Sequence, residues 1–192
     1  MEKKIIYLSP SAQEANIGVG NYGTEEYRMN RIADVLQNAF IRSGRYIVYR
    51  NNPAMTLDEI IQDSNSVRPD AHIAIHSNAG GGTGPEIFIY SAGTLDEILA
   101  RAIYDELIRV YYNKSGGRGI KVDYQLKETR EVQAPAVIIE VAFHDNVKDA
   151  AWIINNTPTI AMAIKAGIDS YFNKTTKWIF LLKVNENCAK MF

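Results

Sequence analysis

Two of the three histidines in the chain, His72 and His76, stand four residues apart in the stretch PDAHIAIHSNAGGG. On a helix this spacing would place both imidazoles on one face, where they could bind one metal ion together. On a strand the same spacing separates the two residues by about 13 Å, because a strand rises about 3.3 Å per residue. Zinc–nitrogen bonds measure about 2.0–2.1 Å, so on a strand no single ion takes both histidines as ligands.

The residues around the two histidines favour the strand. Residues 73–75 are Ile-Ala-Ile, which are apolar and partly β-branched, and a helix rarely continues into three glycines such as residues 80–82. We therefore expect His72 in the middle of a strand, as a core or edge histidine with satisfied hydrogen bonds. His76 ends the strand, where α/β proteins bind ligands. It is either a ligand-binding residue or a histidine that hydrogen-bonds its own loop.

Acidic side chains within or next to apolar segments are the second group with chemical potential. Glu140 lies inside the apolar run PAVIIEVAF, where a carboxylate must be paired, neutralised or functional. We favour a functional role for it over a structural ion pair. Glu25 and Glu26 open a helical pattern, where carboxylates usually interact with the helix dipole, and this accounts for at least one of the two.

The composition is that of an ordinary globular protein. The chain has 192 residues, 46% of them apolar and 22% charged, and a net charge of −1, which argues against a nucleic-acid binder. A single cysteine, Cys188, excludes an internal disulfide framework and a cysteine-rich zinc site. No segment approaches the roughly 20 apolar residues of a membrane span, so we expect no membrane insertion. The first residues lack the features of a signal peptide, so we expect synthesis in the cytoplasm and, for a target in the cell wall, action after release.

Apolar patterns of strand and helix type alternate along the chain. Strand patterns cover residues 5–9, 46–50, 70–76, 86–90 and 135–143, and helix patterns cover 25–43, 94–112, 147–155, 157–171 and a segment that begins at 56. Capping boxes at Thr56–Glu59 and Thr94–Glu97 open two of the helices, and Pro158 suits the first turn of another. The stretches 10–24 and 113–119 have the composition of loops. This alternation predicts an α/β domain with a largely parallel sheet covered on both faces.

The α/β pattern ends near residue 173, so we assign residues 1–173 to one domain. Residues 174–192 form a C-terminal tail or the start of a linker. The tail contains the apolar run WIFLLKV, which is either an extra strand or a segment that packs on a partner. We expect it to support self-association.

Four stretches together resemble the zinc-dependent N-acetylmuramoyl-L-alanine amidases, a family that includes phage endolysins and sporulation or cell-separation enzymes. They are YLSPSAQEANIGVGNYGTEEYRMNRIADVL, DAHIAIHSNA, SGGRGIKV and PAVIIEVAFHDNVKDAAWI, in the order of the family, and the resemblance covers about residues 3–173. IHSNA and PAVIIEVAF are specific in combination. The resemblance implies a mixed, largely parallel sheet of about six strands flanked by helices, one zinc ion at the strand ends, and peptidoglycan as the partner.

The resemblance also implies roles for particular residues. The zinc ligands of the family are a histidine in the loop after the first strand, a glutamate at the start of the first helix and a histidine at the end of the central strand. Carried over to this chain, the central histidine is His76, and the catalytic base on the late apolar strand is Glu140. The helix ligand resembles Glu26, which stands four residues before Asn30, more than it resembles Glu25.

The chain departs from the family pattern in the first loop. The pattern resembles Q-x-H-N, but residues 13–16 read Gln-Glu-Ala-Asn, so Ala15 occupies the position of the first zinc ligand. A methyl group cannot bind zinc, and a catalytic zinc normally has three protein ligands and a water. The alanine is an engineered inactivating change, a natural divergence that leaves an impaired enzyme or a binding module, or a loss that His144 or Glu14 compensates. We expect zinc to bind weakly or not at all unless Ala15 is compensated.

The expected reaction is hydrolysis of the amide bond between N-acetylmuramic acid and L-alanine by a zinc-activated water, with Glu140 as general base. We expect Ala15 to impair it. Asn78 and Arg118 are candidate substrate contacts, although Asn78 also suits holding its turn and Arg118 an ion pair. Two alternatives remain: a metal-free peptidoglycan-binding module and a zinc carboxypeptidase acting on wall peptides.

Overall fold

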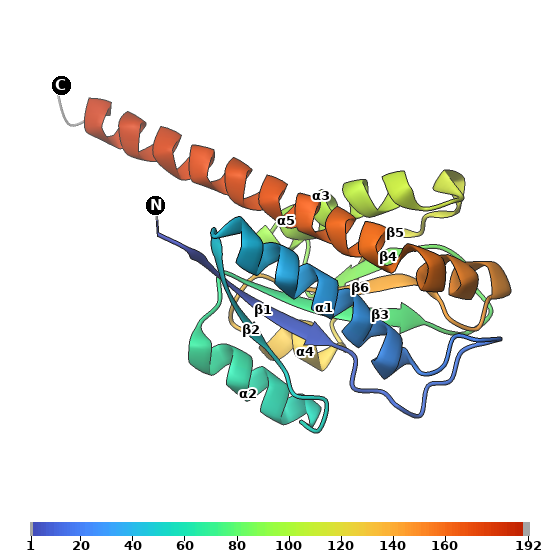
Figure 1. The fold of residues 1–192 in the computed structure, drawn as a ribbon. Coiled ribbons are helices and arrows are strands. Elements are labelled where there is room, and N and C mark those ends of the chain that lie inside the picture. The colour runs from blue at the N-terminus through green and yellow to red at the C-terminus, as the bar shows by residue number, and fades with distance from the viewer. Residues whose placement is uncertain (1, 190–192) are drawn as a thin grey trace.

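A single mixed sheet forms the centre of the computed structural model, which describes the backbone of residues 2–189 and the side chains of residues 2–175 (Figure 1). The strands are β1 (Lys4–Pro10), β2 (Tyr46–Arg50), β3 (Ala71–Asn78), β4 (Glu86–Ile89), β5 (Gly119–Val122) and β6 (Ala136–Phe143). The helices are α1 (Glu25–Ser43), α2 (Leu57–Val67), α3 (Leu95–Val110), α4 (Lys127–Glu131) and α5 (Val147–Ala189), with a 3-10 turn at Lys114–Gly116.

The strand order is β2-β1-β3-β6-β4-β5. Four strands, β2, β1, β3 and β6, run parallel, whereas β4 is antiparallel to β6 and carries β5 parallel to itself. The expected mixed, largely parallel sheet of six strands is confirmed. Because β4 and β5 run in the opposite direction, their first residues lie at the same edge as the last residues of β1, β3 and β6. We call this edge the carboxyl edge.

Helices cover both faces of the sheet, and the two faces differ. One face carries α1, α3 and α5, and the opposite face carries only α2 and the five-residue α4 (Figure 1). The apolar stripe of α1, with Met29, Ile32 and Leu36 among its buried residues, packs on the first face together with Ile73 and Ile75 of β3. The larger core therefore lies on the side of the longer helices.

Strand alternation sends a different set of side chains to the α2/α4 face. Successive residues of a strand point to opposite faces, so Ile73 and Ile75 enter the core while His72 and His76 point the other way. Glu140 lies directly opposite His76 in the register of β3 and β6. The thinner cover on this face leaves room for a pocket, and the polar residues of the sheet line it.

The helix signals are confirmed in part. Thr56 forms the expected capping box with Glu59. Thr94 makes no side-chain cap, so the second predicted box is wrong; the carboxylate of Glu97 instead accepts a hydrogen bond from the backbone N–H of Gly93. Glu97 thus reaches back to the N–H of the residue before Thr94, and the two halves of a capping box are not formed.

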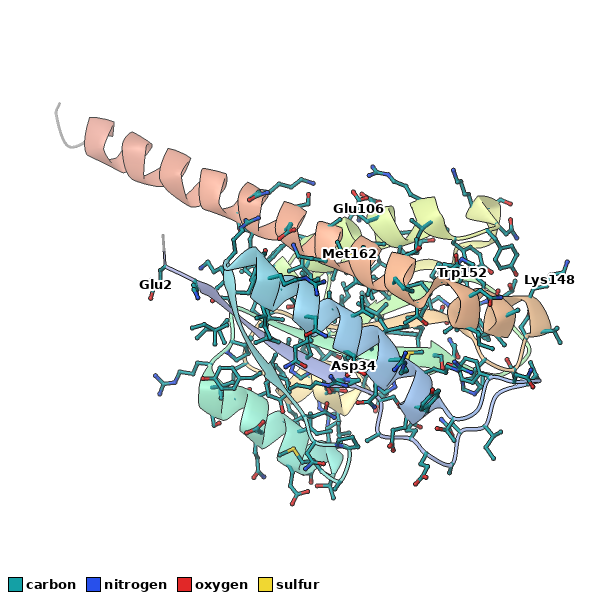
Figure 2. All side chains as sticks on the ribbon, viewed as in Figure 1. Glu2, Asp34, Glu106, Lys148, Trp152 and Met162 are labelled. Atoms are coloured by element: carbon teal, nitrogen blue, oxygen red, sulfur yellow. The ribbon has the colours of Figure 1, made fainter. Side chains whose placement is uncertain are left out.

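The two helices expected at 147–155 and 157–171 join into α5. The backbone leaves helical geometry at Asn156 (φ −122°, ψ 18°), two residues before Pro158, as expected for a proline that cannot donate to the preceding turn. Trp152 on the first half of α5 is buried and meets the Tyr111 ring edge-on at 5.0 Å, whereas Lys148 is exposed (Figure 2). Buried residues lie on both sides of the break, Trp152 and Ile153 before it and Ile160 and Ile164 after it.

No strand is formed by the tail as far as Ala189, the last of its residues that the structure describes. The backbone of α5 continues as a helix through Ala189, and Figure 1 shows its last turns extending beyond the sheet. The sixth strand is β5, which falls in a stretch where only a loop up to residue 119 was expected. The side chains of WIFLLKV lie outside the described residues, so self-association through this segment stays a prediction. Within the described part of the chain, no helix has the length and apolarity needed to cross a bilayer.

Candidate active site

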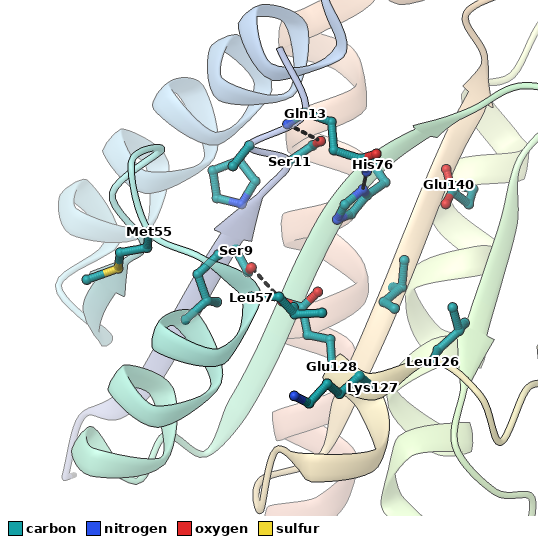
Figure 3. Close-up of a pocket in the computed structure, with 14 residues that line it drawn as sticks. Ser9, Ser11, Gln13, Met55, Leu57, His76, Leu126, Lys127, Glu128 and Glu140 are labelled. Carbon is teal, nitrogen blue, oxygen red and sulfur yellow. Dashed lines mark hydrogen bonds between the residues drawn. The ribbon is translucent and has the colours of Figure 1, made fainter. Parts of the chain in front are cut away.

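His76 lies near the end of β3, with its ring in a pocket at the carboxyl edge (Figure 3). Its Nδ1 atom is 2.9 Å from Oε1 of Glu25 and 3.3 Å from Nε2 of Gln13. The side chain is 17% exposed, and none of the contacts of the described residues uses its other ring nitrogen, Nε2. Nδ1 therefore lies next to a carboxylate with which it could bind a metal ion in place of the shared hydrogen bond, whereas Nε2 has no partner among the described residues.

Glu25, and not Glu26, is the acid that meets His76. Glu25 is the first residue of α1, is 1% exposed, and also accepts hydrogen bonds from the Asn16 side chain (2.8 Å) and the backbone N–H of Ser77 (3.3 Å). Glu26 is half-buried, and its backbone carbonyl, not its carboxylate, accepts from the Asn30 side chain at 2.8 Å. The spacing of Glu26 and Asn30 thus reflects one turn of helix, and the geometry favours Glu25 as the candidate ligand.

The pKa shifts of His76 and Glu25 are those of an ion pair. Burial lowers the pKa of His76, but the hydrogen bond that it donates to Glu25 and the charges of Glu140 and Glu25 outweigh burial, so the pKa is raised. Burial raises the pKa of Glu25, but its hydrogen bond and charge interaction with His76 outweigh it, and the pKa is lowered. Each partner favours the charged form of the other.

Glu140 is the unsatisfied group of the site. Its Oε2 atom is buried and has no hydrogen-bond partner among the described residues. Burial is the largest cause that raises its pKa to about 7; the charges of Glu25 and Glu86 add to the rise, and that of His76 opposes it. A carboxyl group that gains and loses its proton near neutral pH, beside an open pocket, suits a general base.

Ala15 lies in the loop between β1 and α1, and its neighbours contact both members of the pair. Gln13 contacts His76, Asn16 donates to Glu25, and the two amide side chains are joined by a 2.8 Å hydrogen bond. Ala15 is exposed between them. The position expected for the first zinc ligand is therefore held close to His76 and Glu25, although its methyl group offers no donor atom.

His144 does not take the place of the missing ligand in this structure. Its ring is buried, and Nδ1 lies 2.9 Å from both Oγ and the carbonyl oxygen of Ser77, next to the tilted ring of Tyr22. Glu14 is exposed and makes no described side-chain contact. Across the residues whose side chains are described, no three His, Cys, Asp or Glu residues are grouped so that they could hold a metal ion. The donors present thus do not fit a complete catalytic zinc site.

Asn78 and Arg118 converge on a third residue, Glu86. Asn78 and Arg118 (Nε to Oε2, 2.9 Å) both donate to the Glu86 carboxylate, and Lys121 also pairs with it. Glu86 lies opposite Glu140 across the antiparallel pair β4–β6, and neither Asn78 nor Arg118 lines the pocket. In this arrangement the cations of Arg118 and Lys121 pair with the acid beside the base, and Asn78 donates a hydrogen bond to it. The contact of Asn78 and Arg118 with substrate stays a prediction.

The glycine run after β3 is fixed by two aspartates. Asp145 accepts hydrogen bonds from the backbone N–H groups of Gly80 and Gly81, both with positive φ, and Asp149 accepts from the N–H of Gly84. A side chain at Gly84 would come within 1.9 Å of the Gly116 carbonyl oxygen. The glycines therefore let the chain turn tightly directly after His76.

Sequence reasoning missed the other end of the pocket. The pocket has a volume of about 430 Å³ and joins His76 and Glu140 to two residues of α4, Lys127 and Glu128 (Figure 3). Glu128 is buried, with Oε1 2.9 Å from Nε2 of His72. A five-residue helix has too few turns to show an apolar period, so no signal in the sequence marked Glu128 as a buried acid.

Comparison with known proteins gives concordant matches. Residues 6–170 match the profile of the family described as N-acetylmuramoyl-L-alanine amidase. N-acetylmuramoyl-L-alanine amidase CwlM of Bacillus licheniformis is 25% identical over 187 residues, covering 93% of this chain and 73% of CwlM. The sporulation-specific N-acetylmuramoyl-L-alanine amidase of Bacillus subtilis strain 168 is 24% identical over 195 residues, covering 97% and 75%. The catalytic domain of CwlV, an amidase from Bacillus (Paenibacillus) polymyxa, shares the fold, with a TM-score of 0.79 at 17% identity over 88% of this chain and 98% of that chain.

Proposed function

The chain belongs to the N-acetylmuramoyl-L-alanine amidase family, and from this premise we propose that it hydrolyses the amide bond between N-acetylmuramic acid and L-alanine in peptidoglycan. The observation that carries the proposal is Glu140, a buried carboxyl group with an unpartnered oxygen and a pKa of about 7, opposite His76 on the neighbouring strand. The cell wall is then its place of action, reached after release from the cytoplasm.

Glu140 moves the proton in this reaction. As a carboxylate it takes a proton from water, and the oxygen of that water attacks the carbonyl carbon of the lactyl group. The carbon–nitrogen bond then breaks, and the protonated Glu140 gives the proton to the departing amino group of L-alanine. A pKa of about 7 suits both transfers, because the group is then neither too weak a base nor too weak an acid at neutral pH.

Zinc is the finer part of the proposal. His76 and Glu25 supply a nitrogen and a carboxylate, but a third protein donor is missing from the set, so we expect this chain to hold zinc weakly or not at all. When bound in such a site, zinc polarises a carbonyl group and lowers the pKa of a bound water. Replacement of Ala15 by histidine adds a nitrogen donor at the position that Gln13 and Asn16 hold close to the pair.

The missing donor also favours a second candidate function. A chain with the amidase fold and Ala15 in place of a ligand can bind peptidoglycan without cleaving it. The pocket next to His76 would then serve recognition alone.

The products formed from purified cell wall distinguish these functions. The chain as given, the Ala15→His variant and the double variant Ala15→His/Glu140→Gln are incubated with wall and zinc. New N-terminal alanine identifies an amidase, released D-alanine a carboxypeptidase, and pelleting with the wall without either product a binding module. We expect Ala15→His to produce N-terminal alanine and Glu140→Gln to slow it by about 10²–10⁴-fold. A rate within tenfold of Ala15→His would contradict the role of Glu140.

A further inference from the structure

Glu128 is a buried acid in the pocket that the proposed chemistry does not use. It is 6% exposed, and its Oε1 atom accepts a hydrogen bond from Ser9 (2.6 Å) and lies 2.9 Å from Nε2 of His72. His72 is itself held by Ser64 through Nδ1 at 2.8 Å and by stacking on the ring of Tyr7. These contacts fix Glu128 in one position at the α4 end of the pocket.

The second oxygen of Glu128 is directed into the pocket. None of the hydrogen bonds or ion pairs described for this chain uses Oε2, and Figure 3 shows it pointing away from Ser9, on the side that faces His76. Burial raises the pKa of Glu128, but its hydrogen bond and charge interaction with His72 outweigh it, so the pKa is lowered and the group is a carboxylate. A buried carboxylate oxygen is stabilised by a donor, and here the pocket is the side from which one can come.

The surroundings of Glu128 suit a peptide. Among the described residues that line the pocket there is no Phe, Tyr or Trp. Its apolar lining consists of Met55, Leu57, Ile60, Leu126 and Ile138. Lys127 adds a cation, 35% exposed and paired with Asp58. Aliphatic surface binds a methyl group, a carboxylate binds an amide N–H, and an ammonium binds a carboxylate.

We propose that this half of the pocket is a subsite for the first two residues of the peptidoglycan stem peptide. The Oε2 atom of Glu128 accepts the N–H of the amide that joins L-alanine to the next residue, and the aliphatic side chains contact the alanine methyl group. Lys127 binds the carboxylate of that next residue. The assignment rests on the proposed function, because the peptide begins at the bond that is cleaved beside Glu140.

The test is binding of two probes that differ only in the peptide. N-acetylmuramoyl-L-alanyl-D-glutamate and N-acetylmuramic acid are titrated calorimetrically into the chain as given, Glu128→Gln, Leu57→Trp and the control Glu106→Gln. Leu57 is 42% exposed at the pocket, so a tryptophan there narrows the subsite without entering the buried network. The control Glu106→Gln removes one negative charge, as Glu128→Gln does, but on α3, which covers the opposite face of the sheet.

We expect the peptide probe to bind the parent more tightly than the sugar acid. Glu128→Gln should weaken the peptide probe by about tenfold to a hundredfold, because an amide would present an N–H where the peptide also donates. Leu57→Trp should weaken it as well, and Glu106→Gln should not. Melting temperatures show whether each variant is folded; if Glu128→Gln is not, Leu57→Trp decides.

Equal affinity of the parent for both probes, no binding of either, or peptide affinity unchanged in the folded Glu128→Gln and Leu57→Trp variants would overturn the subsite. Failure of the subsite and failure of the proposed function are distinguishable. New N-terminal alanine from wall treated with Ala15→His, without dependence of binding on Glu128, contradicts the subsite alone. Binding that depends on Glu128, without any N-terminal alanine, contradicts the amidase function alone.

Discussion

His72 and His76 lie on the same face of β3, four residues apart, and each contacts a buried glutamate. They differ in their burial and in how many of their ring nitrogens have partners in the protein. His72 is fully buried, and both ring nitrogens are occupied, by Ser64 and by Glu128. His76 is partly exposed, and only its Nδ1 atom is held, by Glu25 and Gln13.

The difference shows how one strand can carry a structural and a functional histidine. A buried polar group whose hydrogen bonds are all made within the protein stabilises the fold. A polar group at a pocket whose hydrogen bonds are only partly made there can bind a ligand. Glu140 sharpens the contrast, because its buried Oε2 atom lacks the partners that the oxygen of Glu128 has. The role of each histidine and glutamate therefore depends on how many of its nitrogen or oxygen atoms have partners in the protein, and not on the residue type alone.

The largest expected effect is a difference in the free energy of unfolding that is lost when each histidine is replaced by alanine. His72→Ala should lower the free energy of unfolding by about 3 kcal/mol or more, because it leaves Ser64 without its partner and removes the main partner of the buried Glu128 carboxylate. His76→Ala should cost about 1 kcal/mol, since Glu25 keeps the donors of Asn16 and Ser77. Urea unfolding at pH 7 measures both values, and equal losses would break the comparison.

The next effect concerns the free energy of unfolding, which the buried charge of Glu140 lowers. Its pKa rises from 4.5 to about 7 on folding, so the folded state binds the extra proton and stability falls as pH rises between these values. Glu140→Gln removes the titration and should stabilise the protein by up to about 3 kcal/mol at pH 8, but by little at pH 4.5. Unfolding in EDTA at both pH values measures the gain.

Glu106→Gln is the control for that series, because Glu106 lies on the surface of α3. A gain from Glu140→Gln that is the same at both pH values would show that the stability of the folded state does not depend on the charge of this carboxyl group.

A smaller effect decides between the two glutamates at the start of α1. In an Ala15→His background, Glu25→Gln should weaken zinc binding by about tenfold to a hundredfold or more, because it removes the carboxylate that meets His76. Glu26→Gln should change it little. Competition with a fluorescent chelator gives both dissociation constants, and the reverse order would restore Glu26 as the candidate ligand.

Much of the framework follows from local patterns in the sequence. The helix at 25–43 and the strand at 46–50 have the predicted bounds, and the apolar runs correctly placed His72 inside β3 and Glu140 inside β6. These features depend on neighbours a few residues away, so periodicity and the glycine that follows the helix reveal them.

The details of the site depend on contacts between distant segments. Which of Glu25 and Glu26 meets His76 is decided by how α1 packs against the sheet, and these two residues are 51 and 50 positions from His76. The pairing of Glu128 with His72 joins residues 56 positions apart. Arg118 gave no sign that Glu86 would be its partner. Such pairings follow from the tertiary packing, and no local period encodes them.

The most direct test of the account is the zinc content of two chains. The chain as given and Ala15→His are dialysed against the same buffer after zinc loading, and zinc per chain is measured together with the rate at which each degrades wall. The account predicts little zinc and little hydrolysis in the given chain, and near-stoichiometric zinc with hydrolysis in Ala15→His. Equal, near-stoichiometric zinc in both chains would contradict the assignment of position 15, and no zinc in either would contradict a metal site at His76.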